Sequence, residues 1–193
     1  MRIPALGFSL IVLLSAGAAA ATVIPTPIGV GPRFQPGSST PSTVHGLRVG
    51  SFTCARSRVS RNGVHLELFA NDRVVVVPAG IGIAAPLQLR RGDVVSGGCS
   101  YPARTREPTG VIEIVRSTRL TLGDFFEIWG QPLGPHRLVG FRSDSAHAVR
   151  AYVDGRRVVG ALEAVPLRRH AEIVLELGRY VRPHTTYRFR SGL

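Results

Sequence analysis

The sequence contains no lysine, and all 24 of its basic residues are arginine. This absence excludes a Schiff-base nucleophile, a Ser-x-x-Lys catalytic pair and the lysine of a P-loop. The two Gly-x-Gly segments, at 29–31 and 80–82, lack the third glycine of a dinucleotide-binding loop. Beyond the N-terminus, arginine or glycine interrupts every apolar run before it reaches membrane-spanning length. We therefore expect none of these nucleotide or amine chemistries and no later membrane span.

The first 21 residues have the layout of a secretory signal. Arg2 is followed by an apolar run over residues 8–14 and by small residues that end at Ala21. This order predicts cleavage after Ala21, and the apolar run is too short to favour the alternative of a membrane anchor. We expect an exported protein, periplasmic or extracellular, without a membrane span after cleavage.

The chain carries 24 basic and 12 acidic residues, a formal net charge of +12. Such a charge favours anionic partners, for example lipid head groups, acidic polysaccharides or nucleic acid. The arginines are scattered, however, with no basic tract longer than a pair. A coding bias toward arginine is therefore the simpler interpretation, and we expect no nucleic-acid partner for an exported protein.

Only two cysteines are present, Cys54 and Cys99. In an oxidising compartment they predict one intramolecular disulfide. It would close a loop of about 45 residues, for which loop entropy gives a stabilisation on the order of 4 kcal/mol.

Residues 22–45 are rich in Pro, Gly, Ser and Thr, which predicts a flexible leader outside the core. Residues 46–193 then form one domain, since about 170 residues are enough for a single core. Period-two patterns predict strands at 64–68 and 173–177, and turn residues predict hairpins at Asn71-Asp72 and Asp154-Gly155. Further strands are expected at 52–56, 111–115 and 187–190.

One short helix is expected over residues 120–130. Thr121 and Asp124 have the spacing of a capping box, and Gly130 ends the helix before Pro132. Its apolar stripe, which includes Trp129, predicts core packing. The fold is therefore expected to be mostly β, a single-domain sandwich or partly open barrel with one short helix; the alternative is α+β.

Three segments carry a family resemblance. Residues 64–69 read Val-His-Leu-Glu-Leu-Phe, residues 78–83 read Pro-Ala-Gly-Ile-Gly-Ile, and residues 122–133 read Leu-Gly-Asp-Phe-Phe-Glu-Ile-Trp-Gly-Gln-Pro-Leu. With the stretch 99–114 they resemble an exported family of small, β-rich bacterial and archaeal domains. In that family the first strand reads His-x-His-Ala-His-Leu, and a later segment reads His-Thr-His-Asp. The resemblance covers most of residues 54–178 and implies a histidine cluster typical of a transition-metal site.

This chain departs from the family at the histidines themselves. Arg104 and Arg106 stand where the family has His-Thr-His, followed by Glu107, and Glu113 replaces a later histidine. Arginine has no lone pair to offer a cation. We therefore hypothesise that an Arg–Glu ion-pair network, formed by these four residues, occupies the place of the metal site, and we expect no metal or cofactor.

Two alternatives stay open for these residues. His65, Glu67, His170 and Glu172 form two His–Glu pairs at i, i+2, which is the spacing of a residual metal site on strands. Alternatively, Arg104 and Arg106 form a pocket for a carboxylate, sulfate or phosphate group.

We find no catalytic signature in the sequence. The expected function is that of an exported, non-catalytic structural or ligand-binding domain, with an anionic ligand or a cell-envelope component as partner. The competing class is a hydrolase that uses Glu107 and Glu113 as acid and base, which would require both carboxylates in a cleft.

Overall fold

The computed structural model describes residues 32–37, 48–56, 58–144 and 147–193. The predicted signal at 1–21 and most of the predicted leader, 22–31 and 38–45, lie outside the described residues. Among the described residues, no helix combines the length and apolar character needed to cross a bilayer.

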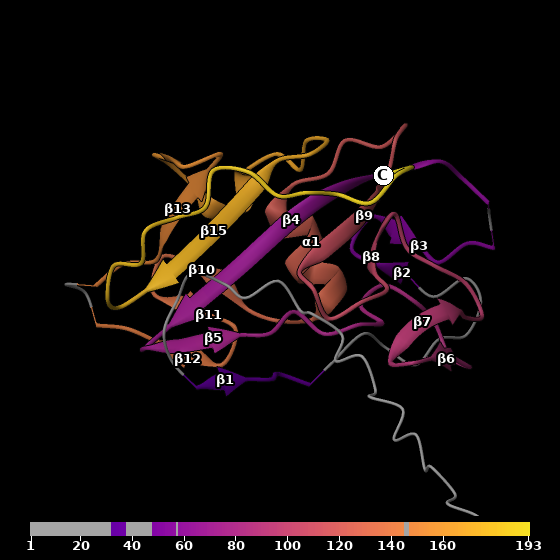
Figure 1. Cartoon of the computed structure of the whole chain (residues 1–193), viewed down its shortest axis with the longest axis horizontal. Helices are drawn as coiled ribbons and strands as arrows, with labels where there is room; N and C mark the ends of the chain where they lie inside the picture. The colour runs from indigo at the N-terminus through magenta and orange to yellow at the C-terminus, as the bar shows by residue number, and fades with distance from the viewer. Residues whose placement is uncertain (1–31, 38–47, 57, 145–146) are drawn as a thin grey trace, which may run out of the picture.

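The central element is the ten-residue strand β4 (Arg61–Ala70). Along one edge it pairs in parallel with β15 (Glu172–Leu177), and along the other it pairs antiparallel with β9 (Val111–Val115) and β5 (Arg73–Val75). The sheet has eight strands, and its order along the main path is β1-β5-β4-β15-β13-β14, with β8 beside β9 (Figure 1). The other strands of this sheet are β1 (Arg33–Phe34), β8 (Ala103–Thr105), β13 (Arg150–Val153) and β14 (Arg156–Arg157).

Three small sheets surround the large one. They are formed by β10 (Leu133–Gly134), β11 (Arg137–Leu138) and β12 (Phe141–Arg142), by β2 (Arg48–Val49) and β3 (Phe52–Thr53), and by β6 (Gln88–Arg90) and β7 (Asp93–Ser96). None of the sheets in the described residues closes into a barrel. The prediction of a mostly-β fold with one short helix is therefore confirmed.

The single α-helix of the described residues, α1 (Leu122–Trp129), covers one face of the large sheet. Thr121 caps it and forms a capping box with Asp124, and Gly130 ends it in the left-handed conformation at φ 70°. The stripe of Leu122, Phe125, Phe126 and Trp129 is fully buried in the main core, as predicted. A short 3-10 helix, η1 (Leu162–Ala164), contacts α1.

Both predicted hairpins are present, because each turn offers residues that accept a positive φ. Asn71 and Asp72 have φ of 49° and 60°, and Asp154 and Gly155 have φ of 51° and 77°. Two consecutive residues at positive φ are typical of type I′ turns, whose twist matches that of paired strands.

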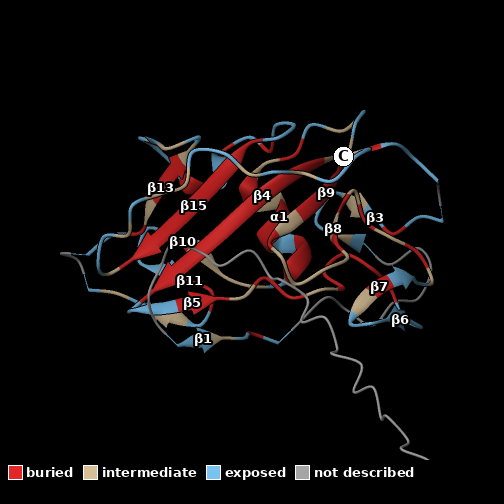
Figure 2. Cartoon of the chain, viewed as in Figure 1, coloured by how far each residue is buried: buried red, intermediate tan, exposed pale blue. Residues whose placement is uncertain are grey.

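Alternate side chains of β4 lie on opposite faces of the sheet. Val64, Leu66 and Leu68 join the main core beneath the sheet, whereas His65 and Glu67 lie on the opposite face. Both faces of β4 and β15 are nevertheless buried, and the peripheral segments are exposed (Figure 2). The second face is covered by residues 179–193, here called the C-terminal strap, which crosses in front of the sheet in Figure 1.

Three sequence-based expectations need correction. The strap forms no strand at 187–190, because its backbone pairs with no neighbour there. The strand expected at 52–56 is limited to Phe52–Thr53. Within the predicted leader, Arg33 and Phe34 form β1, which pairs in parallel with β5, and Phe34 packs against the core.

The predicted disulfide between Cys54 and Cys99 is present, with the two Cα atoms 5.6 Å apart. It joins the segment after β3 to the segment before β8. Both cysteines are buried in the main core.

The cap of α1 provides a test of this local structure. Thr121 accepts a hydrogen bond from the Asp124 backbone N–H at 3.3 Å and also contacts its carboxylate. We expect Thr121→Ala to lower the free energy of unfolding by about 1 kcal/mol, because the capping contacts are lost. Urea denaturation measures this, with the exposed Ser117→Ala as the control, and equal stability of the two variants would contradict the role of the cap.

Candidate functional site

The face of the large sheet beneath the C-terminal strap carries an unusual set of buried charges. All four buried glutamates of the described residues project from this face, with exposed fractions of 8% or less. They are Glu67 on β4, Glu113 on β9, and Glu172 and Glu176 on β15. Because a buried carboxylate is costly without a partner, the contacts of these four residues define the candidate site.

The C-terminal strap closes over this face through alternating side chains. The Tyr187 ring stacks on His65 with ring centroids 3.8 Å apart, and Phe189 stacks on His170 at 4.7 Å. Phe189 also lies over Gly63, where an added Cβ would come within 2.5 Å of the phenyl ring. A residue larger than glycine at position 63 would therefore displace the strap.

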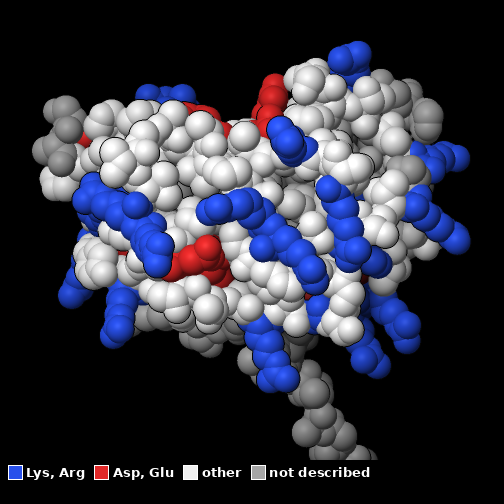
Figure 3. Space-filling view, turned by 90° about the horizontal axis from the view of Figure 1, so that it is seen from above, with Lys and Arg blue, Asp and Glu red and all other residues white. Residues whose placement is uncertain are grey.

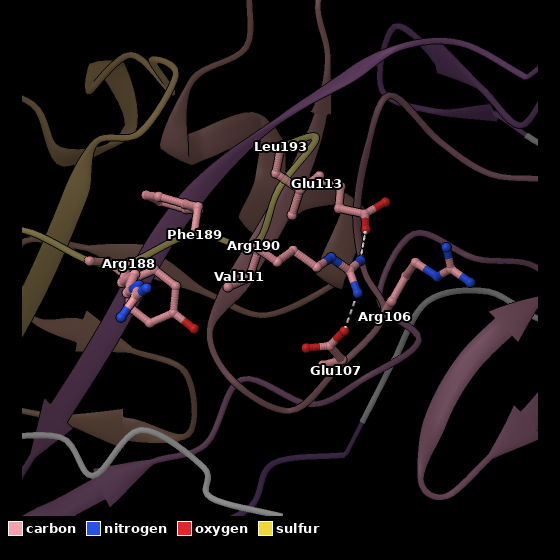
Figure 4. Close-up of a pocket in the computed structure, with 9 residues that line it drawn as sticks. Arg106, Glu107, Val111, Glu113, Arg188, Phe189, Arg190 and Leu193 are labelled. Atoms are coloured by element: carbon pink, nitrogen blue, oxygen red, sulfur yellow. Dashed lines mark hydrogen bonds and ion pairs between the residues drawn. The ribbon is translucent and has the colours of Figure 1, made fainter.

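Glu113 is the centre of an Arg–Glu network. Its Oε2 accepts hydrogen bonds from Arg104 at 2.9 and 2.7 Å, and its Oε1 accepts one from Arg190 of the strap at 2.8 Å. Arg190 also donates to Glu107, so it bridges the two carboxylates, as Figure 4 shows. The structure thus brings together three of the four residues expected in this network, and Arg190 takes the place expected for Arg106.

Arg61 of β4 supports this network from below. Its guanidinium donates to the backbone carbonyls of Tyr101, Pro102 and Glu113 and to the Ser100 hydroxyl. Burial, together with the nearby charge of Arg104, lowers the pKa of Arg61 to about 10. It therefore holds β9 and the segment before β8 against β4.

A second cluster combines histidine and glutamate. His65 Nδ1 lies 2.9 and 2.8 Å from the two carboxylate oxygens of Glu172, and its Nε2 lies 2.9 Å from the carbonyl oxygen of Thr109. A carbonyl only accepts, so Nε2 carries a hydrogen. The Nδ1–Glu172 contact therefore requires one more proton, on the ring or on the carboxylate.

Glu67 lies beside this pair and is held by the strap. His184 Nδ1 contacts both oxygens of Glu67, at 2.8 and 2.9 Å. Burial raises the pKa of Glu67, while the hydrogen bond from His184 opposes that shift. Ligand atoms of His65, Glu67 and Glu172 all lie within 4.8 Å of one another, and all three residues are buried.

His170, the fourth residue of the predicted metal set, is not part of this cluster. It is exposed, and its Nε2 contacts the carbonyl oxygen of Leu193 at 2.7 Å. His170 has φ of 62° and precedes β15, and its ring stacks on Phe189 of the strap rather than contacting His65, Glu67 or Glu172.

The strap residues His184, Tyr187 and Arg190 were not anticipated as site residues. His184 follows Pro183 in a segment without regular secondary structure, a context typical of an exposed side chain. The alternation of Tyr187 and Phe189 with Arg188 and Arg190 did indicate a segment with one buried face. The sequence alone does not show which sheet that face covers.

A cavity of about 250 Å³ lies between the strap and the sheet, lined in part by Glu107, Glu113 and Arg190 (Figure 4). Both carboxylates point toward Arg190, with which they form ion pairs. This arrangement does not give the pair of open carboxylates that the hydrolase alternative requires.

A larger groove, of about 520 Å³, lies between the β6–β7 hairpin, the disulfide-linked segments and β8. Four arginines line it, and none of the described lining residues is acidic; the arginines are Arg56, Arg58, Arg104 and Arg106. We call it the arginine groove. Elsewhere basic side chains are mostly spread singly over the surface, as the view in Figure 3 shows.

No family model, curated protein or solved structure matches this chain at a significant level. The family resemblance stays a prediction from the quoted motifs, and the function is argued below from the geometry.

The Arg–Glu network predicts unequal roles for its two glutamates. Glu113→Gln should lower the free energy of unfolding by about 2–3 kcal/mol, because the side chain is 5% exposed, Arg104 loses its carboxylate partner and Arg190 keeps only Glu107. Glu107→Gln is the control, because Glu107 also pairs with Arg190. The Glu107 side chain is 30% exposed, so this variant should lose less than about 1 kcal/mol of unfolding free energy. Urea denaturation measures both, and equal losses would contradict a network centred on Glu113.

Glu176 predicts a dependence of stability on pH. Burial raises the pKa of Glu176 above its ordinary value of 4.5, against the opposing effect of Arg150. The folded state therefore keeps this proton to a higher pH than the unfolded chain does. Its contribution to stability is complete below about pH 4.5 and is lost as the pH rises through the raised folded value.

We expect the free energy of unfolding of the wild type to fall, relative to that of Glu176→Gln, as the pH is raised above 4.5. Urea denaturation of both proteins over a series of pH values gives this difference directly. If the free energy of unfolding of the wild type instead rose relative to that of Glu176→Gln over this pH range, the effect of Arg150 on the pKa of Glu176 would outweigh that of burial.

Proposed function

We propose that the protein is an exported, non-catalytic binding domain whose ligand carries carboxylate, sulfate or phosphate groups and lies in the arginine groove. The ligand in this proposal is an anionic group of a cell-envelope component. One observation carries the proposal: four arginines line a groove of about 520 Å³ in which no described lining residue is acidic.

The contacts of Arg56 and Arg106 hold these two side chains in place but leave their positive charge available. Arg106 donates to the carbonyl oxygens of Val94 and Val95 at 2.8 and 2.7 Å, and Arg56 donates to that of Gly98 at 2.9 Å. A carbonyl acceptor orients a guanidinium without cancelling its charge. The remaining N–H groups suit the planar, bidentate recognition of oxyanions.

The groove is also built on a covalently fixed frame. Arg56 and Arg58 follow Cys54, and the disulfide joins that segment to Cys99, which itself lines the groove. Fixing the arginines before binding reduces the conformational entropy that binding must overcome. The volume lies within the usual range of about 300–1,000 Å³ for ligand sites.

Export supports the choice of ligand. The signal-like N-terminus predicts passage to a compartment where disulfides persist, and the disulfide in the structure fits that compartment. Acidic polymers of the cell envelope are the abundant polyanions there, and the net charge of +12 favours their approach.

Titration calorimetry with inorganic phosphate and with a short oligogalacturonate tests the proposal. Arg56→Gln/Arg58→Gln should weaken binding of the probe that the wild type binds by about tenfold or more, because charge-assisted hydrogen bonds are lost. The matched control is Arg156→Gln/Arg157→Gln in β14, which removes the same charge at an exposed hairpin and should change affinity less than about twofold.

Binding should also weaken as sodium chloride is raised, since exposed charges are screened. Absence of binding of either probe by the folded wild type would overturn the proposal. Equal weakening by the two double variants would overturn it too, because net charge rather than the groove would then set the affinity.

A further inference from the structure

The two neighbouring carboxylates Glu67 and Glu172 differ from the other buried glutamates in the partners they have. Glu113 and Glu176 are paired with arginines, at 2.7 Å and 3.2 Å. In the described contacts, Glu67 and Glu172 are paired with histidines instead. An arginine-rich chain thus places at these two carboxylates the one basic side chain that can lose its proton and offer a lone pair.

His65 already has the hydrogen bond that orients a metal-binding imidazole. Its Nε2–H donates to the Thr109 carbonyl, so the lone pair of the neutral ring lies on Nδ1 and points at Glu172. This outer hydrogen bond to a backbone carbonyl recurs behind histidine ligands, where it fixes the tautomer and the ring orientation. Tyr187 stacks on the ring and holds it from the other side.

Three of the donors lie close together. Ligand atoms of His65, Glu67 and Glu172 lie within 4.8 Å of one another, and His184, which is outside that group, has its Nδ1 2.8 Å from a carboxylate oxygen of Glu67. Two carboxylates this close in a buried site repel each other unless a cation lies between them. Imidazole and carboxylate together are a donor set that divalent transition metals accept.

We infer that His65, Glu67 and Glu172 form the centre of a binding site for one divalent transition-metal ion of the Zn²⁺ type, and that His184 turns from Glu67 to the ion as a fourth ligand. The ion replaces the protons that otherwise hold the two His–Glu pairs together. Binding therefore releases protons, and affinity rises with pH. Because His184 belongs to the C-terminal strap, the ion also fastens the strap to β4 and β15.

The site differs by one ligand from the alternative metal site that the sequence left open, with His184 in place of His170. It also uses none of the residues that line the arginine groove. Failure of anion binding and failure of metal binding are therefore separate results.

Titration calorimetry of the full chain, stripped with a chelator and then dialysed, tests the inference with Zn²⁺. The wild type should bind one equivalent with a Kd of about 1 μM or tighter. Co²⁺ should give visible absorption bands that report coordination by nitrogen and oxygen. Glu172→Gln and His184→Asn should each weaken Zn²⁺ binding about tenfold or more.

Two other histidines provide matched controls. His147→Asn changes an exposed imidazole that contacts Asp144, and His170→Asn changes the residue predicted from the sequence; both should keep wild-type affinity. Circular dichroism verifies folding, and His184→Asn keeps the test decisive if the buried Glu172→Gln does not fold, because His184 lies at the surface of the strap.

Absence of stoichiometric binding by the folded wild type overturns the inference. Undiminished binding by His184→Asn overturns the four-residue site, as does loss of binding in His147→Asn or His170→Asn. The inference is supported if Glu172→Gln and His184→Asn weaken Zn²⁺ binding while His147→Asn and His170→Asn keep the wild-type affinity.

Discussion

The structure depends on the compensation of four carboxylates that the sheet buries on one face. Glu67, Glu113, Glu172 and Glu176 project from three neighbouring strands on the side opposite the apolar core. Taking an ionised carboxylate out of water costs several kcal/mol, which only a well-placed cation or donor offsets. The C-terminal strap supplies much of that compensation: His184 for Glu67, Arg190 for Glu113 and the Val181 N–H for Glu176. The strap is thus an integral layer of the fold although it adds no strand to the sheet.

The compensation divides the face into two chemically different parts. Around Glu113, arginines carry permanent charge, and Arg61 binds four acceptors of the surrounding backbone and side chains. Around Glu67 and Glu172 the partners are imidazoles, which offer a lone pair when they are neutral. The first part is a structural junction of β4, β9 and the strap. The second part consists of side chains that can both donate and accept hydrogen bonds.

Local sequence signals predicted the elements well where the chemistry is local. The capping box at Thr121 and Asp124, the Asn71-Asp72 and Asp154-Gly155 turns and the period-two segments at β4, β9 and β15 each depend on neighbours within a few residues. The same alternation identified His65 with Glu67 as residues of one face. An Arg–Glu network in this stretch was hypothesised, and the structure pairs Arg104 with Glu113 across the hairpin of β8 and β9.

The assembly of the site could not be predicted, because it depends on contacts between distant segments. β15 pairs in parallel with β4 in a register that sets Glu172 opposite His65, 107 positions away. Parallel pairing leaves no turn signal in the sequence, since its connection is long. Likewise, His184 reaches Glu67 across 117 positions through a strap with no regular secondary structure. The path of the chain, not spacing along it, therefore brings His184 rather than His170 to Glu67.

The arginine groove and the buried face are linked by Arg104, which lines the groove and pairs with Glu113. The anion of the proposed function would therefore compete with Glu113 for this one guanidinium. Glu113 keeps Arg190 on its second oxygen, so a partial loss of Arg104 leaves the carboxylate compensated. The attraction for a ligand then comes chiefly from Arg56, Arg58 and Arg106, and Arg104 serves as the anchor that keeps β8 in place between the groove and the strap-covered face.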